Sequence, residues 1–203
     1  MEKAHKSAEN LESYWCARYE KGRTGWDIGY ASLPLQAYID QIENKEISIL
    51  IPGAGYGYEA EYLFKNGFSQ VDILDIASPP LKAFQSRVPE FPSSQLIKGN
   101  LFKHTGSYDL ILEQTFFCSF EPYSETRQRY AQQMHSLLRP GGKLVGLWFN
   151  HPLNTEGKRP FGGTREEYLT YFTPYFTIKT MEDCYNSIKP RMGSELFGIL
   201  ERK

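Results

Sequence analysis

Residues 47–59 read ISILIPGAGYGYE, and this stretch decides the fold. Its apolar start, which ends at Pro52, predicts a strand covered on both faces, as in a parallel sheet. Gly53, Gly55 and Gly57 follow. Each lacks a Cβ and can adopt positive φ, so a ligand can lie against bare backbone there. The order of strand, glycine turn and helix favours a ligand site, although a turn without a ligand can carry the same glycines.

The segments around this turn predict alternating helices and strands. Residues 58–65 predict a helix that Asn66-Gly67 caps, and residues 71–76 predict a second strand. A strand, a helix and a strand within about 30 residues form the parallel βαβ unit. Further strands are expected at 95–98, 108–113, 143–149, 175–181 and 195–201, and further helices at 7–20, 33–42, 81–88, 121–138 and 164–172.

The C-terminal part of the pattern differs from the rest. The connection between the last two expected strands is too short for a helical crossover, so we expect an antiparallel pair. The breaker residues 139–142 are expected to end the helix before the fifth strand. We predict the α/β class, with a Rossmann-like, seven-stranded, mostly parallel sheet, an antiparallel C-terminal strand and helices on both faces. With 203 residues and 40% hydrophobic content, the chain is expected to form a single domain over residues 1–203.

Composition excludes several classes of function. The 23 Lys and Arg residues balance 24 Asp and Glu residues, so the chain lacks the basic field that nucleic-acid binding uses. Cys16, Cys118 and Cys184 are too scattered for a disulfide framework or a zinc site. No stretch approaches the ~18 apolar residues of a membrane helix. We therefore expect a cytoplasmic protein, a monomer or weak dimer, without a metal and without nucleic-acid or membrane partners.

An acidic residue ends the second expected strand. Asp75 stands at the edge where open α/β sheets bind ligands, close to the glycine turn. A carboxylate at this place can accept both hydrogen bonds from a ribose diol, which favours a nucleoside-containing ligand. The alternative is that Asp75 caps the helix that begins near residues 78–80. Asn100 follows the third strand at the same edge, where it can meet an adenine edge or serve only as a turn residue.

The N-terminal helix carries an aromatic face. Trp15 and Tyr19 lie on it, and Trp26 follows in a turn-rich stretch. Large aromatic side chains usually pack onto a core. A lid so rich in ring surface can also close over a cationic ligand, because a sulfonium is attracted to ring faces. Both interpretations stay open from these residues alone.

Several motifs together resemble the thiopurine S-methyltransferase superfamily, and most closely the plant-type halide and thiol methyltransferases. The resemblance covers nearly the whole chain and implies the class I methyltransferase fold. It is carried by Trp15, Tyr19, Trp26-Asp27, the 51–57 segment IPGAGYG, the 74–76 segment LDI, the 116–122 segment FFCSFEP and the 138–142 segment LRPGG.

The resemblance implies that S-adenosylmethionine is the cofactor and that residues 1–30 form its lid. Gly53 and Gly55 would lie under the methionine portion, Asp75 would hold the ribose hydroxyls, and Asn100 with Leu101 would border the adenine. Asn100 stands where an Asp is common in the family, Tyr19 where a Trp is common, and Gln114 where relatives carry an aromatic residue. The expected cofactor-binding residues are Trp15, Tyr19, Trp26, Gly53, Gly55, Asp75, Asn100, Leu101 and Gln114.

The acceptor side is expected on the loops at the same edge. We expect Phe117, Cys118, Phe161 and Arg191 to line the substrate pocket, with a buried core thiol as the alternative for Cys118. Methyl transfer from a sulfonium is an in-line displacement that depends on alignment and exclusion of water. A thiol of pKa about 8.5 is partly ionised at neutral pH, so no catalytic base is assigned.

The hypothesis is therefore an S-adenosylmethionine-dependent methyltransferase. Its acceptor would be a small soft nucleophile, namely a thiol, a halide, thiocyanate or a thiopurine-like compound. One alternative is an NAD-linked oxidoreductase, which is disfavoured because its third fingerprint glycine would fall at Tyr58. The other alternative is a catalytically silent cofactor-binding module, since a fold does not fix a function.

Overall fold

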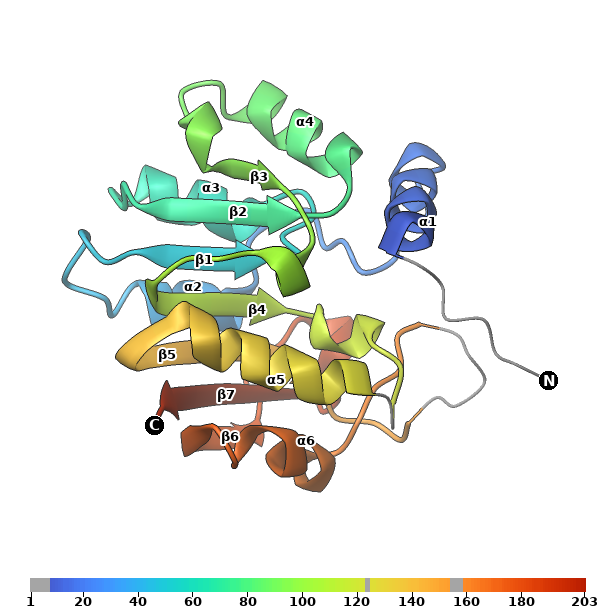
Figure 1. The fold of residues 1–203 in the computed structure, drawn as a ribbon, viewed down its shortest axis with the longest axis vertical. Helices are drawn as coiled ribbons and strands as arrows, with labels where there is room; N and C mark the ends of the chain where they lie inside the picture. Colours follow the sequence, from blue (N-terminus) through green and yellow to red (C-terminus); the bar gives the residue numbers. More distant parts are fainter. Residues whose placement is uncertain (1–7, 123–124, 154–158) are drawn as a thin grey trace.

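A computed structural model describes residues 8–122, 125–153 and 159–203. Seven strands in this part of the chain form one sheet, in the order β3-β2-β1-β4-β5-β7-β6 (Figure 1). The strands are β1 (Ile49–Pro52), β2 (Val71–Asp75), β3 (Leu96–Lys98), β4 (Tyr108–Gln114), β5 (Leu138–Phe149), β6 (Phe176–Asp183) and β7 (Glu195–Arg202). The α-helices are α1 (Ala8–Glu20), α2 (Leu33–Ile39), α3 (Tyr58–Lys65), α4 (Ser78–Arg87), α5 (Glu125–Leu137) and α6 (Arg165–Phe172). Short 3-10 turns are η1 (Ser93–Gln95), η2 (Leu101–Lys103), η3 (Phe117–Ser119) and η4 (Lys189–Arg191).

The direction of the strands confirms the predicted sheet. β1 pairs in parallel with both β2 and β4, and β4 pairs in parallel with β5. β7 lies antiparallel between β5 and β6, so it is the strand that runs against the others in the described sheet. The chain moves outward from β1 in both directions, and such a switch point is where open α/β sheets bind ligands. The arrows of β1 to β4 point toward α1, which stands beside their carboxyl ends (Figure 1).

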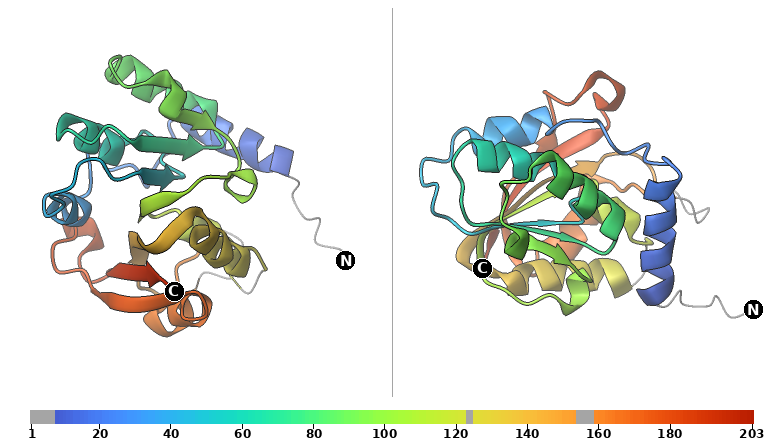
Figure 2. Two further views of the ribbon diagram at one scale, coloured as in Figure 1. Left: turned by 60° about the vertical axis from the view of Figure 1, so that its left-hand side comes forward. Right: turned by 90° about the horizontal axis from the view of Figure 1, so that it is seen from above.

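Alternation along the strands produces a core on each face of the sheet. Leu50 and Ile111 point to one side, where they pack in a cluster with residues of α5 and α6. Ile49 and Leu110, one position away in each strand, belong to the other cluster, with residues of α2, α3 and α4. The right-hand view of Figure 2 shows α2 and α5 on opposite sides of the sheet. Period-two patterning of apolar residues thus explains the three-layered arrangement.

Several element boundaries differ from expectation. Helix α2 ends at Ile39 rather than at residue 42, and α5 begins at Glu125 rather than at residue 121. Helix α4 begins at Ser78 rather than at residue 81, because Pro79 and Pro80 occupy its first turn, where a missing N–H costs nothing. β5 begins at Leu138, so residues 139–142 lie inside the strand and do not separate it from α5. The ladder absorbs them through a shift in register between Tyr108 and Leu110, and Gly141 takes a φ of 75°. In the described ranges, no helix is both long and apolar enough to span a bilayer.

Candidate functional site

The glycine turn and Asp75 lie together at the carboxyl edge of β1 and β2. The turn between β1 and α3 places Gly53 and Gly55 at φ values of 61° and 54°. The Gly55 N–H donates to Asp75 Oδ2 at 2.9 Å, and the Ala77 N–H donates to Asp75 Oδ1 at 2.8 Å. Burial raises the pKa of the Asp75 carboxyl, while these N–H groups act to lower it. Asp75 therefore fixes the turn against β2, and its remaining lone pairs can still accept from a diol.

Two side chains cover the bare backbone of this turn. A Cβ built on Gly53 would overlap the Phe116 ring, and a Cβ built on Gly55 would lie 2.9 Å from the Tyr19 hydroxyl oxygen. The space that two missing side chains leave is therefore used by an aromatic ring and a phenol. The Phe116 ring belongs to the loop after β4 and occupies the position that a side chain at Gly53 would take. Phe116 belongs to the 116–122 motif, but we assigned it no role in the site from the sequence.

The three aromatic residues of the lid form a continuous ring cluster. Trp26 meets Trp15 with ring centroids 5.4 Å apart and Tyr19 with centroids 5.6 Å apart, both edge to face. Tyr19 also meets Tyr56 of the glycine turn, with centroids 5.3 Å apart. Burial raises the pKa of the Tyr19 phenol far above its ordinary value, and the nearby Asp75 carboxylate adds to this rise. The structure thus brings Trp15, Tyr19 and Trp26 together beside the turn.

The N-terminal half of helix α1 contacts a different strand from the one beside Tyr19. Glu12 of α1 forms an ion pair of 2.6 Å with Lys98, the last residue of β3. Figures 1 and 2 both show α1 beside the carboxyl ends of the strands. The lid therefore rests on β3 as well as on the glycine turn.

The other expected cofactor-binding residues lie farther along the same edge. Asn100 Oδ1 accepts from the Phe102 N–H at 2.9 Å and so caps η2, which is the turn role weighed from the sequence. Leu101 is buried against the core. Gln114 ends β4 and is half-buried. Contact of these three residues with the cofactor stays a prediction.

The loop after β4 carries two of the expected pocket residues. Phe117 is fully buried and packs against Tyr130 and Phe172, with centroids 5.0 and 5.5 Å apart. The Cys118 thiol donates to the Thr115 carbonyl at 3.0 Å, and burial raises its pKa, with Glu113 adding to the rise. Cys118 thus has the environment of a buried thiol, the alternative weighed above.

The other two expected pocket residues join this loop to distant segments. The Phe161 N–H donates to the Cys118 carbonyl at 2.9 Å, and the Phe161 side chain is buried. Arg191 Nη2 donates to the Trp26 carbonyl at 2.6 Å, and Arg191 Nη1 lies 3.2 Å from Glu195 Oε1. Arg191 therefore ties the lid to the start of β7. The role of these residues toward a substrate stays a prediction.

Glu113 is a candidate that the sequence reasoning missed. Its side chain is fully buried, and its Oε1 accepts from the Phe116 and Phe117 N–H groups at 2.5 and 3.0 Å. Its Oε2 has no hydrogen-bond partner among the described residues. Burial raises the pKa of Glu113 to about 8. The signal that identified Asp75, an acid at the end of an apolar strand, applies equally to Glu113.

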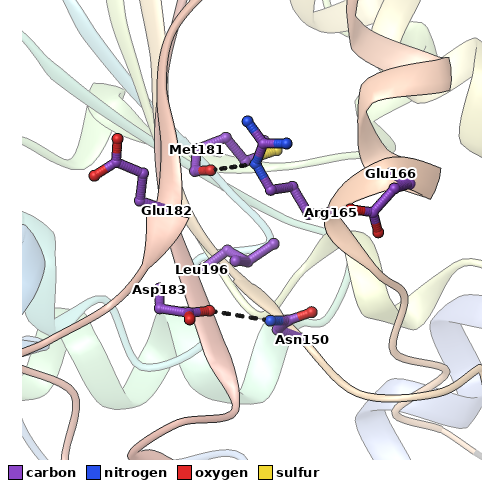
Figure 3. Close-up of a pocket in the computed structure, with 7 residues that line it drawn as sticks. All are labelled: Asn150, Arg165, Glu166, Met181, Glu182, Asp183 and Leu196. Carbon is purple, nitrogen blue, oxygen red and sulfur yellow. Dashed lines mark hydrogen bonds between the residues drawn. The ribbon is translucent and has the colours of Figure 1, made fainter.

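Two open recesses lie away from these residues. One, of about 440 Å³, is bounded by α6 and the ends of β5, β6 and β7, as the close-up of its lining shows (Figure 3). In it, Arg165 Nε donates to the Met181 carbonyl at 2.8 Å and Asn150 Nδ2 donates to Asp183 Oδ1 at 3.1 Å. The other, of about 470 Å³, lies at the amino edge of the sheet, around Asp72 and Tyr108. Neither contains a residue expected in the site.

A family model described as thiopurine S-methyltransferase (TPMT) matches residues 11–201. The chain belongs to this family. Within the curated proteins it is 28% identical over 198 residues to probable thiol methyltransferase 2 of Arabidopsis thaliana, covering 94% of this chain and 85% of the relative. It is 27% identical over 201 residues to thiocyanate methyltransferase 1 of the same plant, covering 96% and 86%.

Solved structures share the fold of this thiopurine S-methyltransferase family member. A 1,6-didemethyltoxoflavin-N1-methyltransferase of Burkholderia thailandensis, with bound S-adenosylhomocysteine, matches with a TM-score of 0.77 at 19% identity, covering 100% of this chain and 92% of that chain. The magnesium protoporphyrin IX methyltransferase of Synechocystis, with bound S-adenosylmethionine, matches with a TM-score of 0.76 at 14% identity, covering both chains fully. The protein is an S-adenosylmethionine-dependent methyltransferase of class I fold. The family match therefore favours this function over the NAD-linked oxidoreductase considered from the sequence.

The residues at the glycine turn fit this cofactor. Gly53 and Gly55 carry no Cβ, and the Phe116 ring and the Tyr19 hydroxyl lie close against their backbone, so both side chains stand at the edge where the cofactor is expected. Asp75 holds a buried carboxylate at the same edge, and the rings of Trp15 and Trp26 supply surfaces that attract a sulfonium. Within the described ranges, no group of three or more His, Cys, Asp or Glu residues is arranged to hold a metal ion.

Proposed function

We propose that this enzyme methylates small soft anions, with a thiolate, hydrosulfide, thiocyanate or a halide as the acceptor. The names of its plant relatives, a thiol and a thiocyanate methyltransferase, support this class. The cofactor supplies an electrophilic methyl group when it is bound. The chain's own residues hold the reactants in line, and the aromatic lid excludes water from them.

The observation that carries the proposal is the burial of the ionisable groups around the loop after β4. Burial raises the pKa of Glu113, Cys118 and Tyr130 alike. Glu113 and Tyr130 are fully buried, and Cys118 is buried with its thiol donating to the Thr115 carbonyl, so these groups offer little help to an acceptor that must lose a proton. An anion that is already ionised needs no such help. This loop is therefore suited to acceptors that arrive as good nucleophiles.

We assign the cofactor to Trp15, Tyr19, Trp26, Gly53, Gly55 and Asp75. Asp75 is the member of this set with a carboxylate, so replacing it has the clearest effect. Hydrogen bonds to charged groups contribute about 1.5–3 kcal/mol, so Asp75→Asn is expected to weaken S-adenosylhomocysteine binding roughly 10- to 100-fold by calorimetry. The control is Asp72→Asn in the same strand, because the Asp72 carboxylate accepts from the Tyr108 hydroxyl at 2.7 Å, at the opposite edge.

The acceptor is tested by a transfer screen. Purified enzyme and S-adenosylmethionine are incubated with iodide, thiocyanate, hydrosulfide or a thiopurine, and the methylated products are measured by gas or liquid chromatography. Turnover of the first three above the thiopurine is expected. Turnover of none, with intact cofactor binding, would identify the silent binding module. Unchanged affinity in Asp75→Asn would overturn the cofactor assignment.

A further inference from the structure

Three arginines lie around the loop after β4, and two of them are neutralised. Arg127 is fully buried and forms an ion pair of 2.8 Å with Glu167. Arg191 forms an ion pair of 3.2 Å with Glu195. Arg159 has no carboxylate partner in the described ranges. It is therefore the arginine of this region whose charge is left uncompensated there.

Arg159 is nonetheless held in one place. Its Nε donates to the Ser119 carbonyl at 2.7 Å, at the end of η3. Its guanidinium carbon lies 5.2 Å from the centroid of Tyr14, 5.7 Å from that of Trp15 and 5.3 Å from that of Phe161. Ring faces attract a cation but do not cancel its charge. A positive group is thus fixed where the lid meets the loop after β4.

The guanidinium also keeps donors for another group. It has five N–H donors, and only the Nε donor has a hydrogen-bond partner among the described residues. Arg159 is half-buried, so its field is less screened than that of an exposed arginine. A guanidinium is always charged and is weakly hydrated, which suits large, polarisable anions.

Position favours the acceptor over the cofactor as the anion. Arg159 is bonded to η3 and packs on Phe161, and Phe161 in turn donates to the Cys118 carbonyl. The glycine turn and Asp75, which are assigned to the cofactor, lie at β1 and β2, and among the described residues Arg159 is connected to that side through the rings of Trp15, Trp26 and Tyr19.

We propose that Arg159 binds the anionic acceptor and selects for its negative charge. The inference rests on the proposed function and deepens it. Arg159 takes no part in bond making: it attracts the anion and holds it at the junction of lid and loop. Trp15 lies beside the proposed anion, so binding of the anion can be followed by tryptophan fluorescence.

Iodide tests this directly, since it is a soft anion and also quenches tryptophan fluorescence. With S-adenosylhomocysteine at saturation and ionic strength kept constant with chloride, the wild type is expected to show a saturable component of iodide quenching. Arg159→Met keeps the apolar stem and should raise the half-saturation concentration about 10-fold or more. Arg159→Lys keeps the charge and should stay within about threefold of the wild type.

Arg165→Met is the matched control. Arg165 makes the same kind of contact through Nε, to the Met181 carbonyl, but it lies in the recess of Figure 3. It should leave iodide quenching unchanged. Acrylamide, a neutral quencher, should act equally on all variants if the lid stays in place. The KM for thiocyanate should rise in Arg159→Met in parallel with the iodide constant, while kcat changes less.

The outcomes separate the possible roles. An unchanged iodide constant in Arg159→Met would overturn the proposal. A loss of S-adenosylhomocysteine affinity in Arg159→Met with iodide binding retained would also overturn it, because the anion would then be the cofactor's carboxylate. If the wild type binds S-adenosylhomocysteine and transfers no methyl group, the proposed function fails, and saturable iodide binding still reports on Arg159 separately.

Discussion

The Glu113 carboxyl should make the stability of this protein depend on pH in a direction opposite to that of an ordinary paired carboxylate. Burial raises its pKa from 4.5 to about 8, so the folded protein keeps a proton that the unfolded chain has lost. Stability from this group is complete below pH 4.5 and falls as the pH rises toward 8. The unfolded state binds one proton fewer, so the free energy of unfolding falls by up to about 1.4 kcal/mol per pH unit.

Glu113→Gln isolates this effect. An amide oxygen can still accept from the Phe116 and Phe117 N–H groups, as Oε1 does now, but the side chain no longer titrates. The two pKa values imply that the penalty in the wild type grows by about 2.5 kcal/mol between pH 5 and pH 7, with a limit of about 5 kcal/mol. Glu113→Gln should gain that difference over the wild type across this range.

The assay is urea unfolding of both proteins at pH 5, 6, 7 and 8, followed by tryptophan fluorescence. Contributions from other titrating groups cancel in the difference between the two proteins. Glu61→Gln provides a control that should not depend on pH in this range. Burial acts to raise the pKa of Glu61, but hydrogen bonds from Lys65 and Arg87 outweigh it and lower the pKa below 4.5, so its stabilising contribution is nearly complete at pH 5 and the difference from the wild type should stay nearly constant up to pH 8. A pH-independent gain in Glu113→Gln would show an ionised Glu113 and refute the reasoning.

Two further predictions concern the packing at Gly57 and the buried ion pair of Arg127. In Gly57→Ala, the new Cβ would lie 2.7 Å from the buried Phe84 ring at a φ of 69°, so chemical denaturation should show a loss of about 2–4 kcal/mol. Gly29→Ala, at a φ of 80° with nothing within 4 Å, should lose only about 1 kcal/mol, and equal losses would contradict the packing argument. Glu167→Gln removes the ion-pair partner of fully buried Arg127 and should lower the free energy of unfolding by about 3 kcal/mol in the same assay. A loss below 1 kcal/mol there would show that the backbone carbonyls around Arg127 suffice.

The fold could be predicted because its signals are local. The run before Gly53 is apolar without interruption, and a strand buried on both faces requires this. Helix α3 follows the glycine turn and covers one face of the sheet, as a βαβ unit demands. The error at residues 139–142 has a non-local cause. Arg139 forms an ion pair of 2.5 Å with Asp109 of β4, so the breaker residues are held beside a neighbouring strand. Rules based on the local sequence alone do not include this contact.

The site could be predicted only in part, for the same physical reason. Asp75 was found because parallel strands bring their carboxyl ends to one edge, so position in the chain gives position in space. The contact of Arg191 with the Trp26 carbonyl joins residues 165 positions apart, and the packing of Arg159 on Trp15 is of the same kind. Such contacts depend on how loops fold over the sheet, and no periodic pattern encodes them.

Asp75 and Glu113 share one sequence pattern, an acidic residue near the carboxyl end of an apolar strand, but their carboxyl groups have different hydrogen bonds. Asp75 is the last residue of β2 and Glu113 the last but one of β4, the two strands beside β1. Each carboxyl accepts from two backbone N–H groups, those of Gly55 and Ala77 for Asp75 and those of Phe116 and Phe117 for Glu113. Asp75 uses one oxygen for each N–H, and both bonds act against the rise in pKa that burial causes. Glu113 uses a single oxygen for both, and its other oxygen lies buried without a partner in the described structure. A proton on that oxygen lowers the cost of burial, so the acid behind the loop after β4 is held neutral, whereas both oxygens of the acid beside the glycine turn already accept a hydrogen bond.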